Sequence, residues 1–478
     1  MKAPVTTINA TDGAVPATDA PMPHHAIMAE AEGESRSERI QRGKALRKTV
    51  PRSAHARWEP PADRRDPISV LQASDPLRQP DLLPIRYGRM MESPFTFLRG
   101  SASVMACDLA STPTTDLLVQ ACGDAHLANF GLFATPERQL VFDLNDFDET
   151  LRGHWEWDIK RLAASLVVAG RTNGLSRDVC DESVLKAMLT YRGRLAQYAT
   201  MDYLALWYTQ VNTQDVLDMV SGFAHKVAQR HVRKAQRRNH LHAFARLTEV
   251  VDGRVQLIND PPLLMHVSDP IMGDHIEELL MGYLASLRED RRDLLCRYTM
   301  VDFARKVVGV GSVGTRCYVM LLTGKDQGDP LFLQMKEANA SVIETYGEGR
   351  KSTHANHGQR VVRGQQMIQA ASDIFLGFGR MGMEHYYVRQ LRDMKGSVDS
   401  STLTPSGFVT YATLCAWALA RAHARSGDVA ALTSYLGKRD IFDHALVAFA
   451  NAYADQTERD HAALVAAVKS GRVKAETL

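Results

Sequence analysis

The chain has 478 residues, of which 45% are hydrophobic and 23% are charged, a composition typical of folded proteins. At the usual ~100–200 residues per domain, this length accommodates two to four domains or one two-lobed enzyme with a tail. The 57 Lys and Arg nearly balance the 55 Asp and Glu, and the net charge is +2. No overall field therefore favours nucleic acid or an anionic membrane, and neither is expected as a partner.

The chain is predicted to be cytoplasmic. No apolar run approaches the roughly 18 residues needed to span a bilayer. The N-terminus lacks the basic region and apolar block of a secretory signal. The six cysteines are far apart, form no C-x-x-C pair and have mostly apolar neighbours, so we expect reduced thiols with a structural role.

The first elements in chain order are a tail and a group of short strands. Residues 1–35 are rich in Ala, Pro, Thr and Gly and are predicted to form a disordered tail. The basic stretch that follows is interpreted as a solvated helix and an extended segment. Beyond Pro94, the segments FTFLRG, LLVQACGDAH and QLVFDLNDFDE predict strands, and Asp158 opens an amphipathic helix. Helical patterns then dominate to about residue 300.

A small β-rich unit follows in the middle of the chain. From Val307 onward the sequence reads as two β-rich runs joined by a Gly/Asp/Pro hairpin loop. After them we expect a helix over residues 359–371, a strand at HYYVRQL and C-terminal helices. The period of the apolar residues therefore changes from helical to strand-like and back again.

The first cluster of polar residues joins GDAHLANFG (123–131) to VFDLNDFDE (141–149). An apolar strand delivers an Asp into a short loop, an Asn follows five residues later, and a second strand ends in several carboxylates. Phosphoryl transfer needs this layout, with one Asp at the acceptor hydroxyl and an Asn and a later Asp at Mg²⁺. The alternative is that these carboxylates cap turns and that His126 is a core histidine. Crowded carboxylates repel one another without a cation, which disfavours that alternative.

The second cluster is the G-x-G-x-x-G pattern at Gly309, Gly311 and Gly314. A dinucleotide-binding fold requires this pattern to open a helix, whereas here it runs into a strand-like segment. A glycine-rich turn between two strands instead matches the flap over ATP phosphates in kinases, and the next strand, LFLQMKE, contains Lys336 near its end. The alternative is a plain hairpin with a surface lysine.

Together with WEWDIKRLAAS, RVVRGQQMIQAASDIFLG, YYVRQLRDMKGS and LARAHARSGD, these motifs resemble the bacterial family called domain of unknown function 2252, over roughly residues 38–478. The family name carries no assigned activity. More distantly, GDAHLANFG followed by NDFDE resembles the catalytic and metal-binding loops of aminoglycoside and choline phosphotransferases and other protein-kinase-like enzymes.

The kinase resemblance implies a role for each matching residue. Asp124 would be the catalytic base and Asn129 a Mg²⁺ ligand, while Lys336 would pair with the ATP phosphates. The glycines that would cover those phosphates are Gly309, Gly311 and Gly314. The second metal ligand is Asp146, because NDFDE resembles the D-F-D/E of small-molecule kinases, or Asp143, which lies nearer the usual strand position.

Two supporting roles follow from the same comparison. Lys336 needs an acidic partner to order it, and Glu344 and Glu337 are the candidates. Asp158 is expected to cap its helix and to brace the catalytic loop.

The resemblance implies an α+β, protein-kinase-like fold with two lobes. Because Gly309 follows Asp124 in the chain, whereas kinases have the opposite order, we expect a circular permutation. The predicted parts are the tail (1–35), the N-terminal part of the helical lobe with the catalytic and metal-binding loops (36–300), a β-rich nucleotide-binding lobe (301–395) and the C-terminal part of the helical lobe (396–478).

The sequence thus predicts an ATP- and Mg²⁺-dependent phosphotransferase with a small-molecule acceptor, or a nucleotidyl transferase on the same fold. One alternative is a metal-dependent phosphohydrolase, whose two metals would be bound by Asp124, His126, Asp143, Asp146 and Asp148. Another is a degenerate kinase-like module that binds nucleotide without chemistry. The acceptor and the oligomeric state are left open.

Overall fold

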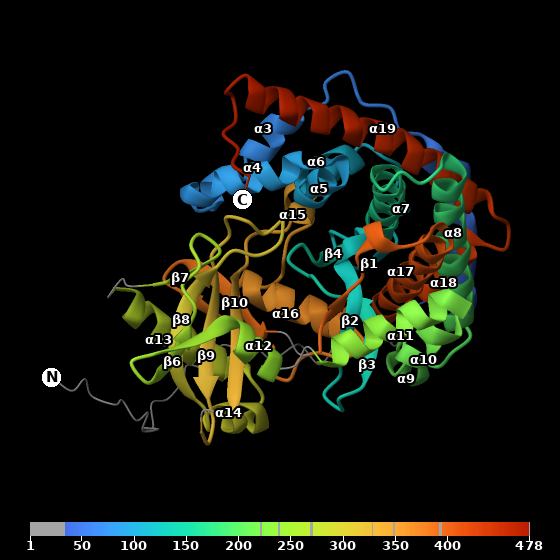
Figure 1. The fold of residues 1–478 in the computed structure, drawn as a ribbon. Coiled ribbons are helices and arrows are strands. Elements are labelled where there is room, and N and C mark those ends of the chain that lie inside the picture. The colour runs from blue at the N-terminus through green and yellow to red at the C-terminus, as the bar shows by residue number, and fades with distance from the viewer. Residues whose placement is uncertain are drawn as a thin grey trace.

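The computed structural model describes residues 34–219, 222–237, 240–267, 271–326, 328–347, 349–391 and 394–477. Most of the predicted tail, residues 1–33, lies outside the described residues. Ser35, its last residue, begins the ordered chain by capping α2 (Arg36–Thr49) in a reciprocal pair of hydrogen bonds with Glu38. The described chain combines a large helical part with a six-stranded sheet (Figure 1).

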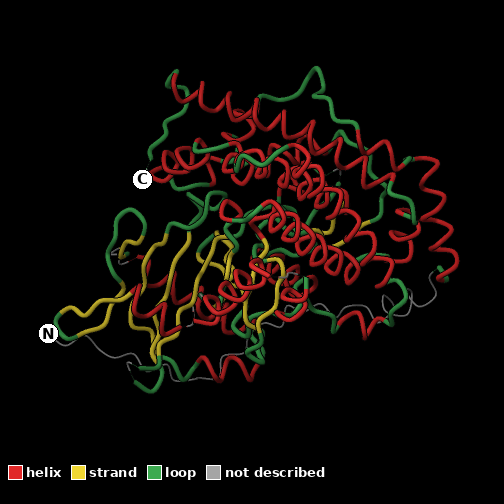
Figure 2. Tube along the Cα trace, turned by 45° about the vertical axis from the view of Figure 1, so that its right-hand side comes forward, coloured by secondary structure: helices red, strands yellow, loops and turns green. Residues whose placement is uncertain are grey.

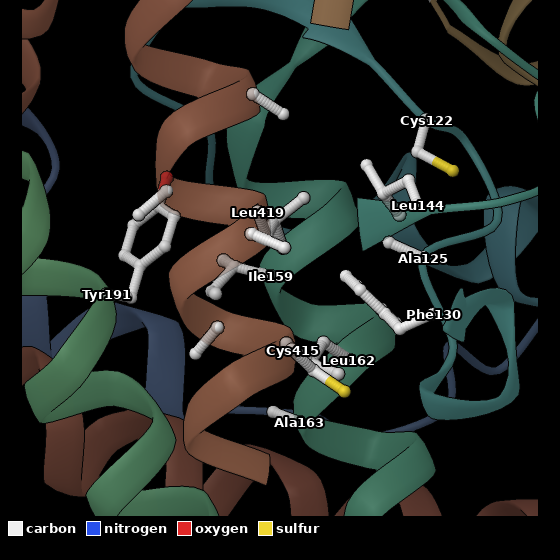
Figure 3. Close-up of a cluster of buried hydrophobic side chains, with 14 of the residues drawn as sticks. Cys122, Ala125, Phe130, Leu144, Ile159, Leu162, Ala163, Tyr191, Cys415 and Leu419 are labelled. Atoms are coloured by element: carbon white, nitrogen blue, oxygen red, sulfur yellow. The ribbon is translucent and has the colours of Figure 1, made fainter. Parts of the chain in front are cut away.

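The core of the helical part is built from two segments that are far apart in the sequence. One contains α7 (Trp155–Thr172) and α8 (Arg177–Tyr198), and the other contains α17 (Pro405–Ser426) and α19 (Ile441–Lys469). Apolar side chains from α7, α8 and α17 interlock with those of the neighbouring loops and strands (Figure 3). The helical part is therefore completed only when the chain returns after the sheet.

The large sheet is antiparallel throughout, with strand order β11-β12-β10-β9-β8-β7. Its strands are β7 (Leu264–His266), β8 (Thr299–Lys306), β9 (Cys317–Thr323), β10 (Pro330–Glu337), β11 (Gly377–Met381) and β12 (Glu384–Gln390). Every residue of β10 is buried, as its near-continuous apolar sequence requires. Helix α16 (His357–Ile368) connects β10 to β11 and packs on both β11 and β12. The strands of the large sheet gather on one side of the molecule and the long helices on the other (Figure 2).

Two small sheets lie where the helical part meets the large sheet. One pairs β1 (Leu118–Ala121) with β4 (Leu151–His154), and the other has the order β13-β2-β3, with β2 (Phe130–Ala134), β3 (Leu140–Leu144) and β13 (Gly396–Ser397). The loops that follow β1 and β3 carry the first cluster of polar residues. A separate hairpin is formed by β5 (Thr248–Val251) and β6 (Arg254–Leu257).

Shorter helices complete the fold. They are α3 (Pro67–Gln72), α4 (Leu83–Met91), α5 (Pro94–Gly100), α6 (Ala102–Leu109), α9 (Tyr203–Trp207), α10 (Thr213–Asp218), α11 (Gly222–Arg237), α12 (His240–Leu247), α13 (Ile271–Ser286), α14 (Glu289–Leu295), α15 (Val342–Tyr346) and α18 (Val429–Leu436). None of the helices that the structure describes is both long and apolar enough to cross a bilayer.

The α+β class and most of the predicted elements are confirmed, including the strands at LLVQACGDAH, QLVFDLNDFDE and HYYVRQL. The predicted strand FTFLRG is wrong, because these residues form α5. Ser93 caps this helix in a capping box with Thr96, and Pro94 occupies its first turn. The helical prediction up to residue 300 missed β5, β6 and β7. The six cysteines are unpaired, as expected.

Candidate functional site

A cavity of about 500 Å³ lies between the glycine-rich side of the large sheet and the loops that follow β1 and β3. Predicted site residues line it from both sides: Asp124, Asn129 and Asp146 from the loops, and Gly309, Gly311 and Lys336 from the sheet. The fold therefore brings together two clusters that are distant in the sequence. Asp143 and Gly314 do not line this cavity.

The Asp124 loop turns sharply at Gly123, whose φ is +81°. A Cβ at this position would come within 2.2 Å of the carbonyl oxygen of Glu149, so only glycine fits. The carboxylate of Asp158, in the first turn of α7, accepts hydrogen bonds from the amides of Cys122 (2.7 Å) and Gly123 (2.8 Å). The predicted bracing role of Asp158 is confirmed, but it is not the helix cap, because His154 holds the cap position.

Replacing Asp158 with asparagine is expected to destabilise the protein, because an amide cannot accept both backbone hydrogen bonds as a charged carboxylate does. Each hydrogen bond to a charged group is worth about 1.5–3 kcal/mol, and we expect a loss of this size in the free energy of unfolding. Urea denaturation would measure it. Asp178→Asn, an exposed carboxylate in the first turn of α8, is the matched control and should change stability by less than about 0.5 kcal/mol. Equal stability of the two variants would contradict the bracing role.

The Asp124 side chain faces the cavity while Arg161 holds it in place. The Nε of Arg161 donates to Oδ1 of Asp124 at 2.6 Å, and the Asn129 amide Nδ2 donates to the Asp124 carbonyl at 2.6 Å. This bond turns Oδ1 of Asn129 away from that carbonyl. His126 Nε2 lies 3.7 Å from Oδ2 of Asp124, and burial lowers the pKa of His126 to about 4. His126 is therefore a neutral, buried imidazole at pH 7.

Lys336 on β10 reaches across the cavity to the carboxylates that follow β3. Its Nζ lies 3.5 Å from Oδ1 of Asp146 and pairs directly with Asp148. Burial opposes the charge on Lys336, but both carboxylates raise its pKa well above the ordinary value. Burial would likewise raise the pKa of Asp146, but Lys336 and Arg389 outweigh it, so this pKa is lowered. The site holds a charged lysine and a charged carboxylate in its ligand-free form.

The acidic partner of Lys336 differs from the expectation. Glu337 forms its ion pair with Arg316 at 3.1 Å, because neighbouring residues of β10 point to opposite faces of the sheet. Glu344 lies 3.7 Å from both Arg360 and His357. Neither glutamate contacts Lys336, whose partners come from the loop after β3.

Asp143 belongs to the protein interior. Its carboxylate is fully buried and accepts hydrogen bonds from Arg421 of α17 at 2.5 Å and from the amides of Leu144 and Ala370 at 2.9 and 2.7 Å. Of the two candidates for the second metal ligand, the structure places Asp146 at the cavity and commits Asp143 to this ion pair.

The glycine-rich loop connects strands β8 and β9. The interpretation as a phosphate-covering flap requires two strands here, whereas a dinucleotide-binding fold would have a helix after the glycines. The hydroxyl of Ser312, at the middle of the loop, donates to Oδ2 of Asp148 at 3.4 Å. Arg78 donates to the carbonyls of Gly311 (3.1 Å) and Val313 (2.5 Å). Gly314 has a φ of +90° and packs against the Arg78 side chain, so it shapes the loop without facing the cavity.

Several cavity residues were missed by the sequence reasoning: Arg78, Arg86, Arg99, Glu149 and Lys395. Burial raises the pKa of Glu149 to about 7, and burial together with Arg389 lowers that of Lys395 to about 7. These residues come from separate segments, and no local spacing links them to the two clusters. Only the unusual density of arginines between residues 78 and 99 could have drawn attention to that segment.

The cavity offers oxygen ligands but no metal cage. Among the residues that the structure describes, no group of three or more His, Cys, Asp or Glu side chains is arranged to hold a metal ion. Mg²⁺ usually binds through one or two carboxylates, substrate phosphates and water, and Asp146 and Asn129 are the predicted ligands that line the cavity. The donor set therefore fits Mg²⁺ brought by a nucleotide better than a preformed two-metal centre.

Comparison with known proteins gives one result. A family model described as "Uncharacterized protein conserved in bacteria (DUF2252)" matches residues 78–467. Curated proteins and solved structures yield no match. The matched range contains all the residues that line the cavity except Val70, Ala73, Ser74 and Leu77.

Proposed function

Because this chain belongs to the bacterial family DUF2252, whose description assigns no activity, we propose a function from its cavity: an ATP- and Mg²⁺-dependent phosphotransferase with a small-molecule acceptor. The observation that carries the proposal is the convergence on one cavity of the glycine-rich loop and Lys336 with the loop residues Asp124, Asn129 and Asp146. A strand, a glycine loop and a lysine facing an Asp and an Asn are the parts that phosphoryl transfer requires.

Each residue takes the role that its position allows. Asp124, oriented by Arg161, accepts the proton of the acceptor hydroxyl. Lys336 binds the phosphates, and the backbone around Gly309 and Gly311 covers them. Asn129 and Asp146 would hold Mg²⁺, which would neutralise phosphate charge.

The proposed fold is a circularly permuted, two-lobed kinase-like arrangement. It is supported by the position of the glycine loop and Lys336 opposite the catalytic loops, although the chain visits them in the reverse order. It is also supported by the return of α17 and α19 to complete the helical part. The use of ATP and the six unpaired cysteines fit a cytoplasmic location.

The phosphohydrolase alternative has weaker support. It counts Asp143 among its five candidate metal ligands, and Asp143 is bound to Arg421 in the interior. It also leaves Lys336 and the glycine-rich loop without a role. A degenerate, nucleotide-binding module is separated from the proposal by the second experiment below.

Thermal unfolding with and without MgATP tests nucleotide binding. At about 100 times its dissociation constant, a ligand should stabilise the native protein by about 2.7 kcal/mol. We expect this shift in the wild type and its loss in Lys336→Ala and Asp146→Asn, each compared with its own ligand-free form. Lys325→Ala, an exposed lysine before β10, is the matched control and should keep the shift. A wild type indifferent to MgATP would refute the proposal, and a shift with metal alone that ignores Lys336 would favour the phosphohydrolase.

Labelled ATP separates chemistry from binding. We expect incubation with γ-labelled ATP and a bacterial extract to label a small molecule. Transfer of label from α-labelled ATP instead would indicate nucleotidyl transfer. Binding without either transfer would identify a degenerate module.

A further inference from the structure

The cavity has a basic end that the proposed roles leave unused. It is formed by Arg86 of α4, Arg99 at the end of α5 and the first residues of α6, and it lies beside Asp124. Figure 1 shows α4, α5 and α6 above the large sheet, on the side where the chain also ends. We infer that this end binds an anionic group, a phosphate or a carboxylate, on the acceptor molecule.

Arg99 is the main indication. In the described part of the chain its guanidinium has no hydrogen-bond or ion-pair partner, and its Cζ lies 6.0 Å from the centre of the Phe95 ring. Its Nε is buried. Burial lowers the pKa of Arg99, and Asp124 supplies the largest opposing charge. A cation that is partly desolvated without a counter-ion is unfavourable, and an anion in the cavity would relieve that cost.

Arg86 provides the second cation. Its side chain is only 1% exposed, yet it lines the cavity. One nitrogen, Nη2, donates to the carbonyl of Gly100 at 3.2 Å, and Nη1 lies 3.5 Å from the Asp75 carboxylate. Its Nε has no hydrogen-bond partner among the described residues. Asp75 also accepts a hydrogen bond from Tyr87. Burial lowers the pKa of Arg86 despite the nearby Asp75 charge, so Asp75 compensates the buried cation only in part.

The N-terminus of α6 adds backbone donors. Ala102 and Ser103 begin this helix and line the cavity. Ser101 holds the cap position but gives no side-chain cap, because its hydroxyl donates to the Leu98 carbonyl at 3.2 Å. Exposed amides and the helix dipole favour an anion at such an end. Arg99, the Gly100 carbonyl that binds Arg86 and the uncapped start of α6 therefore follow one another in the α5–α6 corner.

Arg161 connects this end to the proposed chemistry. The guanidinium that orients Asp124 through Nε also donates through Nη2 to the Leu98 carbonyl at 2.7 Å, just before the α5–α6 corner. An acceptor anchored at this corner would thus present its hydroxyl to Asp124. This assignment of the anion to the acceptor rests on the proposed phosphotransferase function, whereas the anion site itself does not.

Titration with inorganic phosphate tests the site. Calorimetry at low ionic strength should show binding to the wild type, at least about tenfold weaker binding to Arg99→Gln, and an intermediate effect in Arg99→Lys, because charge-assisted hydrogen bonds are lost in part or in full. Arg288→Gln removes an 80% exposed arginine and is the matched control, with unchanged binding. Because Arg99 has no hydrogen-bond or ion-pair partner in the described protein and its desolvated charge is unfavourable, its replacement should not lower the thermal unfolding temperature.

The location of the anion is decided by competition. Binding should persist in Lys336→Ala and in the presence of a saturating non-hydrolysable ATP analogue with Mg²⁺. Binding that depends on Lys336 and ignores Arg99, or no binding by the wild type, would overturn the inference. Methyl phosphate binding more tightly than acetate would indicate a phosphorylated acceptor, and the reverse order a carboxylate. Phosphate binding through Arg99 in a protein without an ATP shift would support the anion site and refute the phosphotransferase.

Discussion

Replacing Asp124 with asparagine is expected to slow phosphoryl transfer by about a hundred- to ten-thousand-fold, the usual contribution of a general base. Asparagine keeps the size of the side chain and can still accept the hydrogen bond from Arg161 Nε. It cannot take the proton of an acceptor hydroxyl. The measurement is the initial rate of transfer from γ-labelled ATP to the acceptor fraction of a bacterial extract.

Binding provides the control for this variant. Asp124→Asn should retain the MgATP-dependent shift in thermal unfolding, because Lys336 and Asp146 are untouched. Loss of both transfer and the shift would indicate a damaged cavity and would leave the base unassigned. An unchanged transfer rate would show that Asp124 is not the base and that the proposed reading of the GDAHLANFG loop is wrong.

Replacing Arg421 with methionine is expected to lower the free energy of unfolding by about 3–5 kcal/mol, the cost of removing one partner from a buried ion pair. Both side chains of the Arg421–Asp143 pair are fully buried. The variant leaves Asp143 with two backbone donors and without its ion-pair partner. Arg421 also donates to the carbonyl of Ile368 at 2.6 Å, so that oxygen would lose a partner as well. Urea denaturation would measure the loss.

An exposed ion pair is the control for the buried Arg421–Asp143 pair. Arg288→Met breaks the ion pair with Asp290, whose partners are 80% and 50% exposed, and should change stability by less than about 1 kcal/mol. Asp146→Asn, at the cavity, should abolish the MgATP shift with a smaller loss of stability than Arg421→Met. A large effect of Arg421→Met on the MgATP shift at unchanged stability would contradict the structural role of Asp143.

Local sequence signals predicted the loops of the site well. The GDAHLANFG segment follows a strand, the carboxylates follow β3, and Lys336 lies near the end of a fully buried strand, all as expected. Turn chemistry, alternation and apolar runs are local properties, so they can be read without knowledge of the fold. The wrong strand prediction for FTFLRG also concerned a local signal. Ser93 is a helix-capping residue directly before this segment, but the prediction relied on the short apolar run instead.

The ion-pair partners of the site residues could not be predicted from local sequence signals. The motif comparison retained both Asp143 and Asp146, and it offered Glu344 and Glu337 to Lys336. In the structure, Asp143 pairs with Arg421, and Lys336 pairs with Asp146 and Asp148. Each of these pairs joins segments far apart in the chain, and which side chains meet depends on how strands and helices pack.

The order of strand-like and helical segments in the 478 residues was sufficient to predict an α+β protein whose first polar cluster follows two strands. Those features depend on composition and on neighbours along the chain. The cavity shared by both polar clusters, the burial of Asp143 and the basic end at Arg86 and Arg99 required the tertiary structure. Electrostatic interactions depend on distance and burial, and both are set by long-range packing that no local pattern encodes.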